Sequence, residues 1–286
     1  MRYTTLISAA ELAAHSGATD LLIIDCRHDL LNPDAGLAAY RTAHIAQAQF
    51  AHVDLTMSGA KIGADGKFKG RHPLPQRQDF VAAMQALGVN DTTQVVAYDA
   101  QGGMYAARLW WLLRWIGHTQ VAVLDGGLQA WQAQAGAMST TNVPAIPGTV
   151  QEKPALVNTI EVDAVLTNIG SRRLTVVDAR AADRYRGENE TIDAVGGHIP
   201  GAKNRFFKDN LDAEGHFKPA QVLHAEWSNV LERAQDAVMQ CGSGVTACHN
   251  LLALEVAGMP GATLYPGSWS EWSADPSRPV ATGSQP

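Results

Sequence analysis

The sequence predicts an α/β protein made of two copies of one domain, each with a mainly parallel β-sheet flanked by helices on both faces. Short aliphatic runs alternate with longer helical stretches along the 286 residues, and this order is typical of parallel strands joined by helical crossovers. The runs, such as "LLIID", "QVVAYD" and "LTVVD", are apolar almost throughout. Uniformly apolar strands are expected where helices cover a sheet on both sides.

The order of motifs in the first half of the chain recurs in the second half. "LLIIDCR" and "VLDGGLQAW" in the first half correspond to "LTVVDAR" and "LYPGSWSEW" in the second, and Asp25 and Asp178 lie 153 positions apart. Self-similarity over such a distance indicates a duplicated domain. We therefore expect a first domain over 1–137, a linker rich in Pro, Ser, Thr and Gly over 138–156, and a second domain over 157–286.

The composition excludes several kinds of partner. The formal net charge is -6, with 46% hydrophobic and 17% charged residues, which is an ordinary globular balance. The 22 Lys and Arg residues are scattered along the chain, so neither nucleic acid nor an anionic membrane surface is expected to bind. The most apolar segment, "LWWLLRWIG", contains Arg114 and is far shorter than a membrane span.

The cysteines indicate a reducing compartment. Three cysteines in 286 residues do not make a disulfide framework, and an odd number leaves at least one thiol free. The N-terminal segment reads as the start of a folded domain rather than as a targeting leader. We expect a cytoplasmic protein.

Two of the three cysteines lie in "CGSGVTAC", residues 241–248, directly after the aliphatic run "DAVM". Cys241 thus ends a predicted strand just before a helical stretch, and open α/β sheets bind ligands beyond the carboxyl ends of their strands. Gly242 and Gly244 allow a tight turn whose N–H groups point at the sulfur. Together with the helix dipole, these groups should stabilise a thiolate. The sequence therefore predicts a nucleophile, the alternative being a small buried residue at a turn.

The first copy has Asp99 at the place that Cys241 occupies in the second. A carboxylate cannot perform thiolate chemistry. We therefore expect the second domain to carry the reaction and the first to be a scaffold that closes one side of a cleft.

With these motifs the chain resembles the tandem-domain rhodanese-like sulfurtransferases over nearly its whole length. The resemblance rests on the strand ends "DCR" and "DAR", on "GHIPGA", on the cysteine loop and on "GSWSEW". A loop reading C-G-S-G-V-T-A is similar to that of the members that use 3-mercaptopyruvate, whereas members that prefer thiosulfate typically carry a more basic loop.

The resemblance implies that Cys241 takes a sulfur from 3-mercaptopyruvate as a persulfide and passes it to a thiol or to cyanide. The acceptor would be thioredoxin-like or a small thiol, and no metal or organic cofactor is implied. N–H groups of the loop would hold the persulfide charge; its residues are Gly242, Ser243, Gly244, Val245 and Thr246. The hydroxyls of Ser243 and Thr246 either add donors or serve a turn and a helix cap. Thiosulfate as the donor and a non-catalytic persulfide carrier are the alternatives.

A donor with a carboxylate calls for a nearby arginine, because a guanidinium binds a planar anion through two hydrogen bonds. Arg184 and Arg186, in "DRYRGENE", are the candidates, and the resemblance implies that Arg184 binds the anionic end of the donor. Many members that use mercaptopyruvate have a second arginine nine residues later, where this chain has Asp193. Either Arg186 substitutes for it or thiosulfate is used. Arg71 and His72, in "GRHPLP", belong to a long first-domain loop that can reach the site, and His72 is a further candidate for substrate binding.

Other polar residues are interpreted as structural because they recur in the copy without the cysteine. These are Asp25 with Arg27, matched by Asp178 with Arg180, and His44, matched by His198. Cys26 and Cys248 are expected in the core.

Two rival chemistries fit the residues less well. A cysteine phosphatase needs an arginine six residues after the nucleophile, and this chain has Ala247 there. Zinc binding by Cys241, Cys248 and His249 is not expected, because spacings of seven and eight residues do not match paired zinc ligands.

Overall fold

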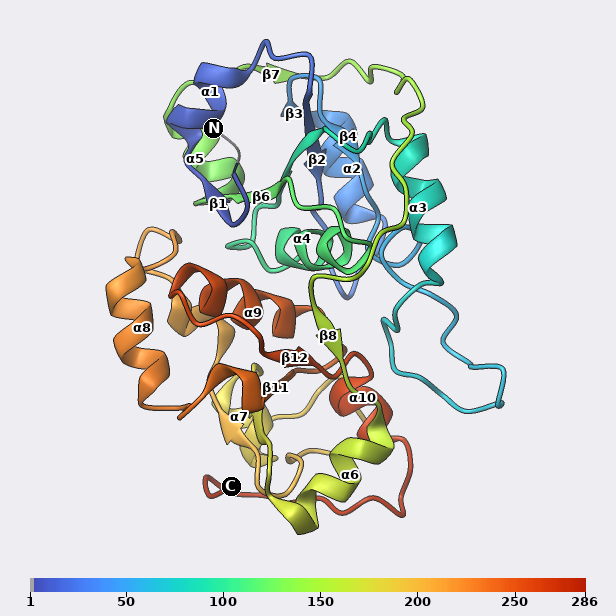
Figure 1. Ribbon diagram of the computed structural model, residues 1–286, viewed down its shortest axis with the longest axis vertical. Helices are drawn as coiled ribbons and strands as arrows, with labels where there is room; N and C mark the ends of the chain where they lie inside the picture. Colours follow the sequence, from blue (N-terminus) through green and yellow to red (C-terminus); the bar gives the residue numbers. More distant parts are fainter. Residues whose placement is uncertain (1–2) are drawn as a thin grey trace. The chain divides into compact units, whose positions relative to one another are not determined.

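The computed structural model describes residues 3–286 and divides into two compact units (Figure 1). The first unit contains the chain up to 59, then 75–156 and 213–217, and the second contains 60–74, 157–212 and 218–286. The segment 60–74 thus belongs structurally to the second unit although the chain returns to the first unit after it. This assignment matters because Arg71 and His72 lie in that segment.

The first unit is built on a five-stranded parallel sheet. Its order is β1 (Leu6–Ile7), β6 (Val121–Leu124), β5 (Gln94–Tyr98), β2 (Leu21–Asp25) and β4 (Gln49–Phe50). The central strands are aliphatic and largely buried, as expected for a sheet covered on both faces. A small antiparallel pair joins β3 (His44–Ile45) to β7 (Met138–Ser139).

Helices flank this sheet, and the first of them begins at a start signal in the sequence. The first helix has a capping box, in which the Ser8 hydroxyl accepts the Glu11 N–H and the Glu11 carboxylate accepts the Ser8 N–H. The helices are α1 (Ala9–His15), α2 (Ala35–Thr42), α3 (Arg77–Ala86), α4 (Ala106–Trp115) and α5 (Gly127–Ala133).

The second unit repeats this topology. Its parallel sheet has the order β10 (Lys203–Asn204), β9 (Thr175–Asp178), β11 (Ala237–Gln240), β12 (Thr263–Leu264) and β8 (Asn158–Thr159). Read from the other edge, each strand has its counterpart in the first unit. The helices are α6 (Val162–Ser171), α7 (Ala182–Arg186), α8 (Ala220–Ser228), α9 (Thr246–Val256) and α10 (Ser268–Ser273), with short 3₁₀ turns at Phe207–Asn210 and Ala234–Asp236. The predicted α/β duplication is therefore confirmed.

The same buried Arg–Asp ion pair follows the equivalent strands β2 and β9 in the two units. Arg27 Nη2 contacts Asp25 Oδ2 at 2.6 Å, and Arg180 Nη2 contacts Asp178 Oδ2 at the same distance, with both carboxylates fully buried. The histidine interpretation is confirmed as well: His198 Nδ1 lies 2.9 Å from the carbonyl oxygen of a tyrosine whose ring stacks on the imidazole. In the first unit His44 makes the equivalent contact at 2.7 Å.

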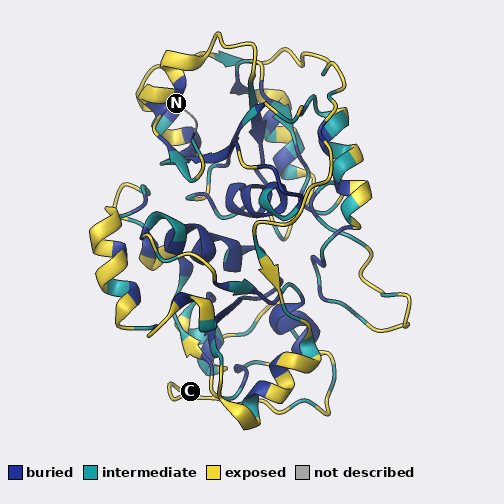
Figure 2. Cartoon of the chain, viewed as in Figure 1, coloured by how far each residue is buried: buried dark blue, intermediate teal, exposed yellow. Residues whose placement is uncertain are grey.

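The helices that follow the central strands are the most deeply buried. Figure 2 shows α4 and α9 in dark blue along most of their length, and Trp110 and Trp111 of α4 are fully buried. Burial of such large apolar side chains is the main favourable contribution to folding. It fixes the start of each helix, and hence the loop before it, against the sheet.

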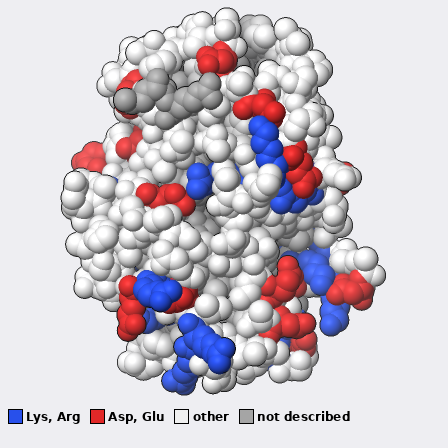
Figure 3. Space-filling view, in the orientation of Figure 1, with Lys and Arg blue, Asp and Glu red and all other residues white. Residues whose placement is uncertain are grey.

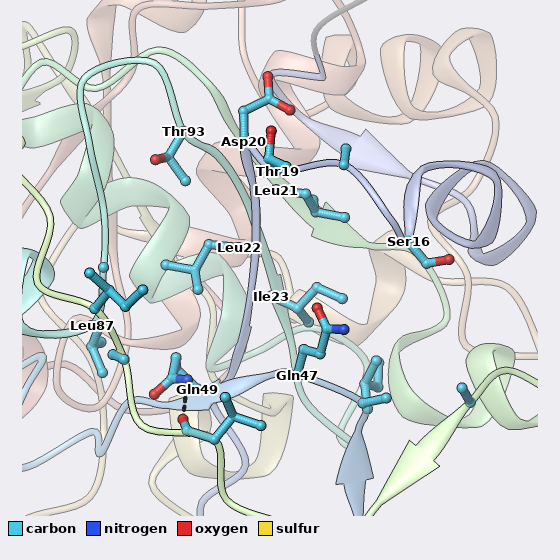
Figure 4. A pocket seen from close by; sticks show the side chains of 18 of the residues that line it. Ser16, Thr19, Asp20, Leu21, Leu22, Ile23, Gln47, Gln49, Leu87 and Thr93 are labelled. Atoms are coloured by element: carbon cyan, nitrogen blue, oxygen red, sulfur yellow. Dashed lines mark hydrogen bonds between the residues drawn. The ribbon is translucent and has the colours of Figure 1, made fainter.

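The first unit also contains a pocket of about 780 Å³ beside the amino-terminal half of β2. Figure 4 shows the side chains of Leu21, Leu22 and Ile23 along β2 and Gln49 on the paired strand β4. The Gln49 amide donates to Val143 O at 2.9 Å. All the residues that line this pocket belong to the first unit, so it is separate from the cysteine loop.

Two observations concern the surface. On the face drawn in Figure 3, basic and acidic side chains are interspersed. Among residues 3–286, no helix is long and apolar enough to cross a bilayer.

Candidate active site

Cys241 lies at the carboxyl end of β11, in the five-residue loop that leads into α9. Its residue is 2% exposed. The turn depends on Gly244, whose φ is +77° and where a Cβ would lie 2.4 Å from Pro266 O. No residue other than glycine fits such an approach without moving the neighbouring loop.

The first residues of α10, which follows the neighbouring strand β12, hold the cysteine backbone in place. The Cys241 N–H donates to Ser268 Oγ at 3.1 Å, and the Trp269 N–H donates to Cys241 O at 2.9 Å. One residue further, the Ser270 N–H donates to Gly242 O at 2.9 Å. The cysteine loop is therefore fixed by three hydrogen bonds from one segment.

Ser268 and Ser270 were not predicted as site residues. Ser268 is fully buried and has a φ of +53°, an unusual backbone conformation for a non-glycine residue. The available signal was the position of "GSWSEW" directly after a strand, since parallel neighbours end at the same edge of a sheet. Strained residues of this kind gather at functional sites.

The equivalent loop of the first unit binds a carboxylate with its own backbone. Asp99 is fully buried, and its two oxygens accept four backbone N–H groups at 2.8–3.0 Å. The donors are Gln101, Gly103, Tyr105 and Ala106. Burial raises the pKa of Asp99 although these donors act in the opposite direction. The strand-to-helix loop of this fold is thus able to surround an anionic side chain with N–H groups.

His72 lies against the cysteine loop, and its role in substrate binding stays a prediction. Its Nδ1 is 2.7 Å from Ser243 Oγ, and both side chains are buried. The imidazole and the hydroxyl form a polar pair two residues from the nucleophile. Such a pair can hold or relay a proton.

Arg184 and Arg71 approach the cysteine loop from two other segments. A Cβ on Gly242 would lie 2.8 Å from Arg71 Nη2 and 3.7 Å from Arg184 Nη2. Both guanidinium groups therefore border the residue that follows Cys241. Arg184 thus lies near the cysteine loop, and its role in binding an anion stays a prediction.

Two buried acids hold these arginines. Glu190 accepts from Arg184 Nε at 3.0 Å and from Arg184 Nη2 at 2.9 Å. Asp193 accepts from Arg71 Nη1 and, at 3.3 Å, from Arg184 Nη2. Burial acts to raise the pKa of Glu190, but the hydrogen bonds from Arg184 and from backbone N–H groups outweigh it and lower that pKa. Burial raises the pKa of Asp193 despite the two arginines.

The remaining predicted residues lie at the edge of this arrangement. Arg186 donates to Glu188 Oε2 at 2.6 Å and is about one-third exposed, so its proposed role in substrate binding stays a prediction. Val245 is buried and precedes α9, whose first residue is Thr246. Cys248 is fully buried in that helix, and its S–H donates to Gly244 O at 3.3 Å.

The second unit thus places a buried thiol, a His–Ser pair and two arginines around one loop. This set suits a nucleophilic sulfur that reacts with a small anion, because guanidinium groups beside the loop can bind the anion. Among the described residues of the second unit alone, no three His, Cys, Asp or Glu side chains converge as metal ligands would.

Comparison with known proteins gives one consistent result. The model of the rhodanese-like domain matches residues 8–134 and 161–275. A probable 3-mercaptopyruvate sulfurtransferase of Pseudomonas aeruginosa is 44% identical over 99% of this chain and 100% of the relative. A putative thiosulfate sulfurtransferase, SseB, of Mycobacterium tuberculosis is 38% identical over 99% of this chain and 98% of its own. The crystal structure of the Escherichia coli 3-mercaptopyruvate sulfurtransferase SseA superposes with a TM-score of 0.80 at 31% identity, covering 94% of this chain and 100% of that one.

Proposed function

Because the chain belongs to the rhodanese-like sulfurtransferases, we propose that it moves a sulfur atom from 3-mercaptopyruvate to a thiol or to cyanide through a persulfide on Cys241. The observation that carries this proposal is the position of the Cys241 loop beside two arginines, Arg184 and Arg71. A keto acid donor has a carboxylate for the arginines and a sulfur for the thiolate. The 44% identity to a probable 3-mercaptopyruvate sulfurtransferase supports this donor.

In the first step the Cys241 thiolate attacks the sulfur of 3-mercaptopyruvate. A sulfur–sulfur bond forms, the carbon–sulfur bond of the donor breaks, and its electron pair stays on the carbon as the enolate of pyruvate. The enolate then takes a proton, which the new persulfide S–H supplies. Pyruvate leaves, and Cys241 retains the additional sulfur as a persulfide anion.

His72 and Ser243 are proposed to act on the keto group during this step. Their 2.7 Å contact allows the imidazole to hold the Ser243 hydroxyl in place while that hydroxyl donates to the keto oxygen of the donor. Negative charge develops on that oxygen as the enolate forms, and a fixed donor stabilises it. The pair thereby lowers the barrier for breaking the carbon–sulfur bond.

The loop N–H groups are proposed to hold the persulfide anion. The loop around Asp99 supports this role, since four backbone N–H groups there already bind a buried anion. Gly242–Thr246 would surround the outer sulfur in the same manner. The persulfide anion, once removed from water, would then still accept hydrogen bonds from these N–H groups.

In the second step an acceptor thiolate attacks the outer sulfur of the protonated persulfide. The sulfur–sulfur bond to Cys241 breaks, the Cys241 thiolate leaves, and the acceptor becomes a persulfide. Cyanide reacts in the same way and yields thiocyanate. The three cysteines are all free, and the reaction needs a reduced Cys241, so we propose a reducing compartment such as the cytoplasm. The acceptor proposed there is a thioredoxin-like protein or a small thiol.

Thiosulfate is a second candidate donor. The 38% identity to a putative thiosulfate sulfurtransferase favours it. So does the lack of a second arginine at position 193, where this chain has Asp193. Thiosulfate would release sulfite and leave the same persulfide. A non-catalytic carrier would form this persulfide without turning over either donor.

The test compares turnover of 3-mercaptopyruvate and of thiosulfate, with cyanide as acceptor, by wild type and Cys241→Ser. We expect a preference for 3-mercaptopyruvate that disappears in the variant, together with a mass increase of one sulfur atom on the Cys241 peptide. A preference for thiosulfate would replace the proposed donor. Persulfide loading without turnover of either donor would show a carrier.

A further inference from the structure

Arg71 is the guanidinium nearest to the residue that follows the nucleophile. Its Nη2 would lie 2.8 Å from a Cβ on Gly242, closer than the nearest atom of Arg184 at 3.7 Å. The side chain is one-fifth exposed, so solvent reaches it. Arg71 belongs to the long segment 60–74, for which the sequence predicted reach of the site but no particular contact.

The main chain around Arg71 is fixed to the cysteine loop through Ser270. The Arg71 N–H donates to Ser270 Oγ at 3.1 Å, and the Ser270 N–H donates to Gly242 O at 2.9 Å. Gly70 has a φ of +101°, and a Cβ there would lie 2.8 Å from Gly267 O. The segment therefore docks closely enough to position the arginine, rather than reaching the site as a loose loop.

Asp193 connects the two arginines. One of its oxygens accepts from Arg71 Nη1 and the other from Arg184 Nη2, and its side chain is only 7% exposed. An acid buried to this extent needs cationic partners. Asp193 therefore orients both guanidinium groups in the absence of a ligand.

Arg71 has more hydrogen-bonding capacity left than Arg184. Arg184 already donates from Nε and Nη2 to Glu190. Among the residues that the structure describes, Arg71 Nε has no hydrogen-bond partner. An arginine that still offers donors is the better candidate for a new anion.

We propose that Arg71 binds the carboxylate of the donor and that Asp193 is a positioning residue for Arg71 and Arg184. This inference rests on the proposed function and specifies how the donor is recognised. The carboxylate of Asp193 alone would repel an anionic donor. Arg71 both neutralises that carboxylate and supplies the second guanidinium of the site.

The test uses two donors that differ only in the group to be recognised. Mercaptoacetone has a methyl group where 3-mercaptopyruvate has its carboxylate, and it reacts by the same sulfur–sulfur and carbon–sulfur steps. The quantity measured is the ratio of kcat/KM for 3-mercaptopyruvate to kcat/KM for mercaptoacetone. In Arg71→Ala we expect this ratio to fall about 10- to 100-fold, mainly through KM for 3-mercaptopyruvate, as for a lost charge-assisted hydrogen bond.

A double variant separates binding from neutralisation. In Arg71→Ala with Asp193→Asn the repulsive carboxylate is gone. A ratio that stays low supports the proposal, and a ratio that returns to the wild-type value would show that Arg71 only neutralises Asp193 and would overturn it. Arg71→Lys should recover part of the ratio. Arg71→Gln replaces the alanine variant if that variant does not fold.

Controls distinguish this inference from the function on which it rests. Arg233 is two-thirds exposed and pairs with Asp236, so Arg233→Ala should leave the ratio unchanged. A wild-type protein that does not turn over 3-mercaptopyruvate would overturn the proposed function and this inference with it. Turnover by wild type with an unchanged ratio in Arg71→Ala would overturn the inference alone.

Discussion

Asp99 and Cys241 occupy the same place in the two units, at the carboxyl ends of the equivalent strands β5 and β11. In the first unit the carboxylate fills its loop and satisfies four backbone N–H groups. In the second unit the shorter side chain of Cys241 stands there instead, and the proposed persulfide would place an anion in that loop. The two equivalent loops thus differ in that the first holds the carboxylate of its own Asp99, whereas the second would hold an anion only once the proposed persulfide forms.

Asp99→Ala should destabilise the first unit without affecting the chemistry of the second. Four buried N–H groups would lose their acceptor, and we expect a loss of about 2–4 kcal/mol in the free energy of unfolding. Denaturant unfolding measures it, with Asp34→Ala as the control because Asp34 is exposed and its side chain makes no helix-capping bond. A loss as small as that of the control would contradict the structural role. Loss of kcat in folded Asp99→Ala would assign Asp99 a part in the reaction.

The three thiols should react very differently with a sulfur donor. Burial raises the pKa of Cys26 well above its usual range, so Cys26 should not react as a thiolate. Cys248 is fully buried in α9, and we expect its thiol to be out of reach of the donor. After incubation with 3-mercaptopyruvate and alkylation, peptide mass spectrometry should locate the persulfide on Cys241 alone. Denatured protein, in which all three thiols are alkylated, is the control. A persulfide on Cys248, or lost turnover in Cys248→Ala, would show that this residue takes part.

Ser268 should contribute to the reaction through the hydrogen bond that its hydroxyl accepts from the Cys241 N–H. Ser268→Ala removes that acceptor, and we expect kcat/KM to fall roughly 5- to 10-fold, the effect of one hydrogen bond. Ser268→Gly also lacks the hydroxyl but suits the φ of +53°, so it should be equally slow yet up to about 1 kcal/mol more stable than Ser268→Ala.

The control for this pair is Ser277→Ala, because Ser277 is exposed and bonds only locally to Asp275. It should match wild type in rate. If Ser268→Gly restored the wild-type rate, the backbone conformation rather than the hydroxyl would position Cys241.

Much of the fold and the centre of the site could be predicted from local patterns. Aliphatic runs and their repetition predict the two parallel sheets, because strands that are buried on both faces are apolar almost throughout. The place of Cys241 follows because a strand, two glycines and a helix occur within a few residues. The pairs ending β2 and β9 were recognisable as structural because both copies have them.

Contacts between distant segments were harder to predict. The segment 60–74 has no periodicity of its own, so nothing local indicated that Arg71 would pair with Asp193 or that it belongs to the second unit. The backbone conformation of Ser268 likewise depends on its neighbours and not on its own sequence. The sequence did mark Asp193 as unusual, and its partner Arg71 supplies the physical reason. The boundaries at 137 and 157 stay a prediction.

Acid should remove the stability that Glu190 provides. The folded-state pKa of Glu190 is lowered, because its hydrogen bonds from Arg184 and from backbone N–H groups outweigh its burial. Such a group stabilises the fold fully above its unfolded-state pKa of about 4.3, and this contribution is lost as the pH falls through the lower folded-state pKa.

Glu190→Gln should therefore be about 1–3 kcal/mol less stable than wild type near neutral pH, and the difference should shrink below about pH 4. Denaturant unfolding of both proteins across this range measures it. Asp193 offsets part of this difference, because the charge of Glu190 acts to raise the pKa of Asp193 and that effect is absent in Glu190→Gln. Glu188→Gln is the control, because Glu188 pairs with Arg186 at the surface, and its stability should differ much less from that of wild type. If the stability difference between wild type and Glu190→Gln did not change with pH, the effect would come from packing rather than from charge.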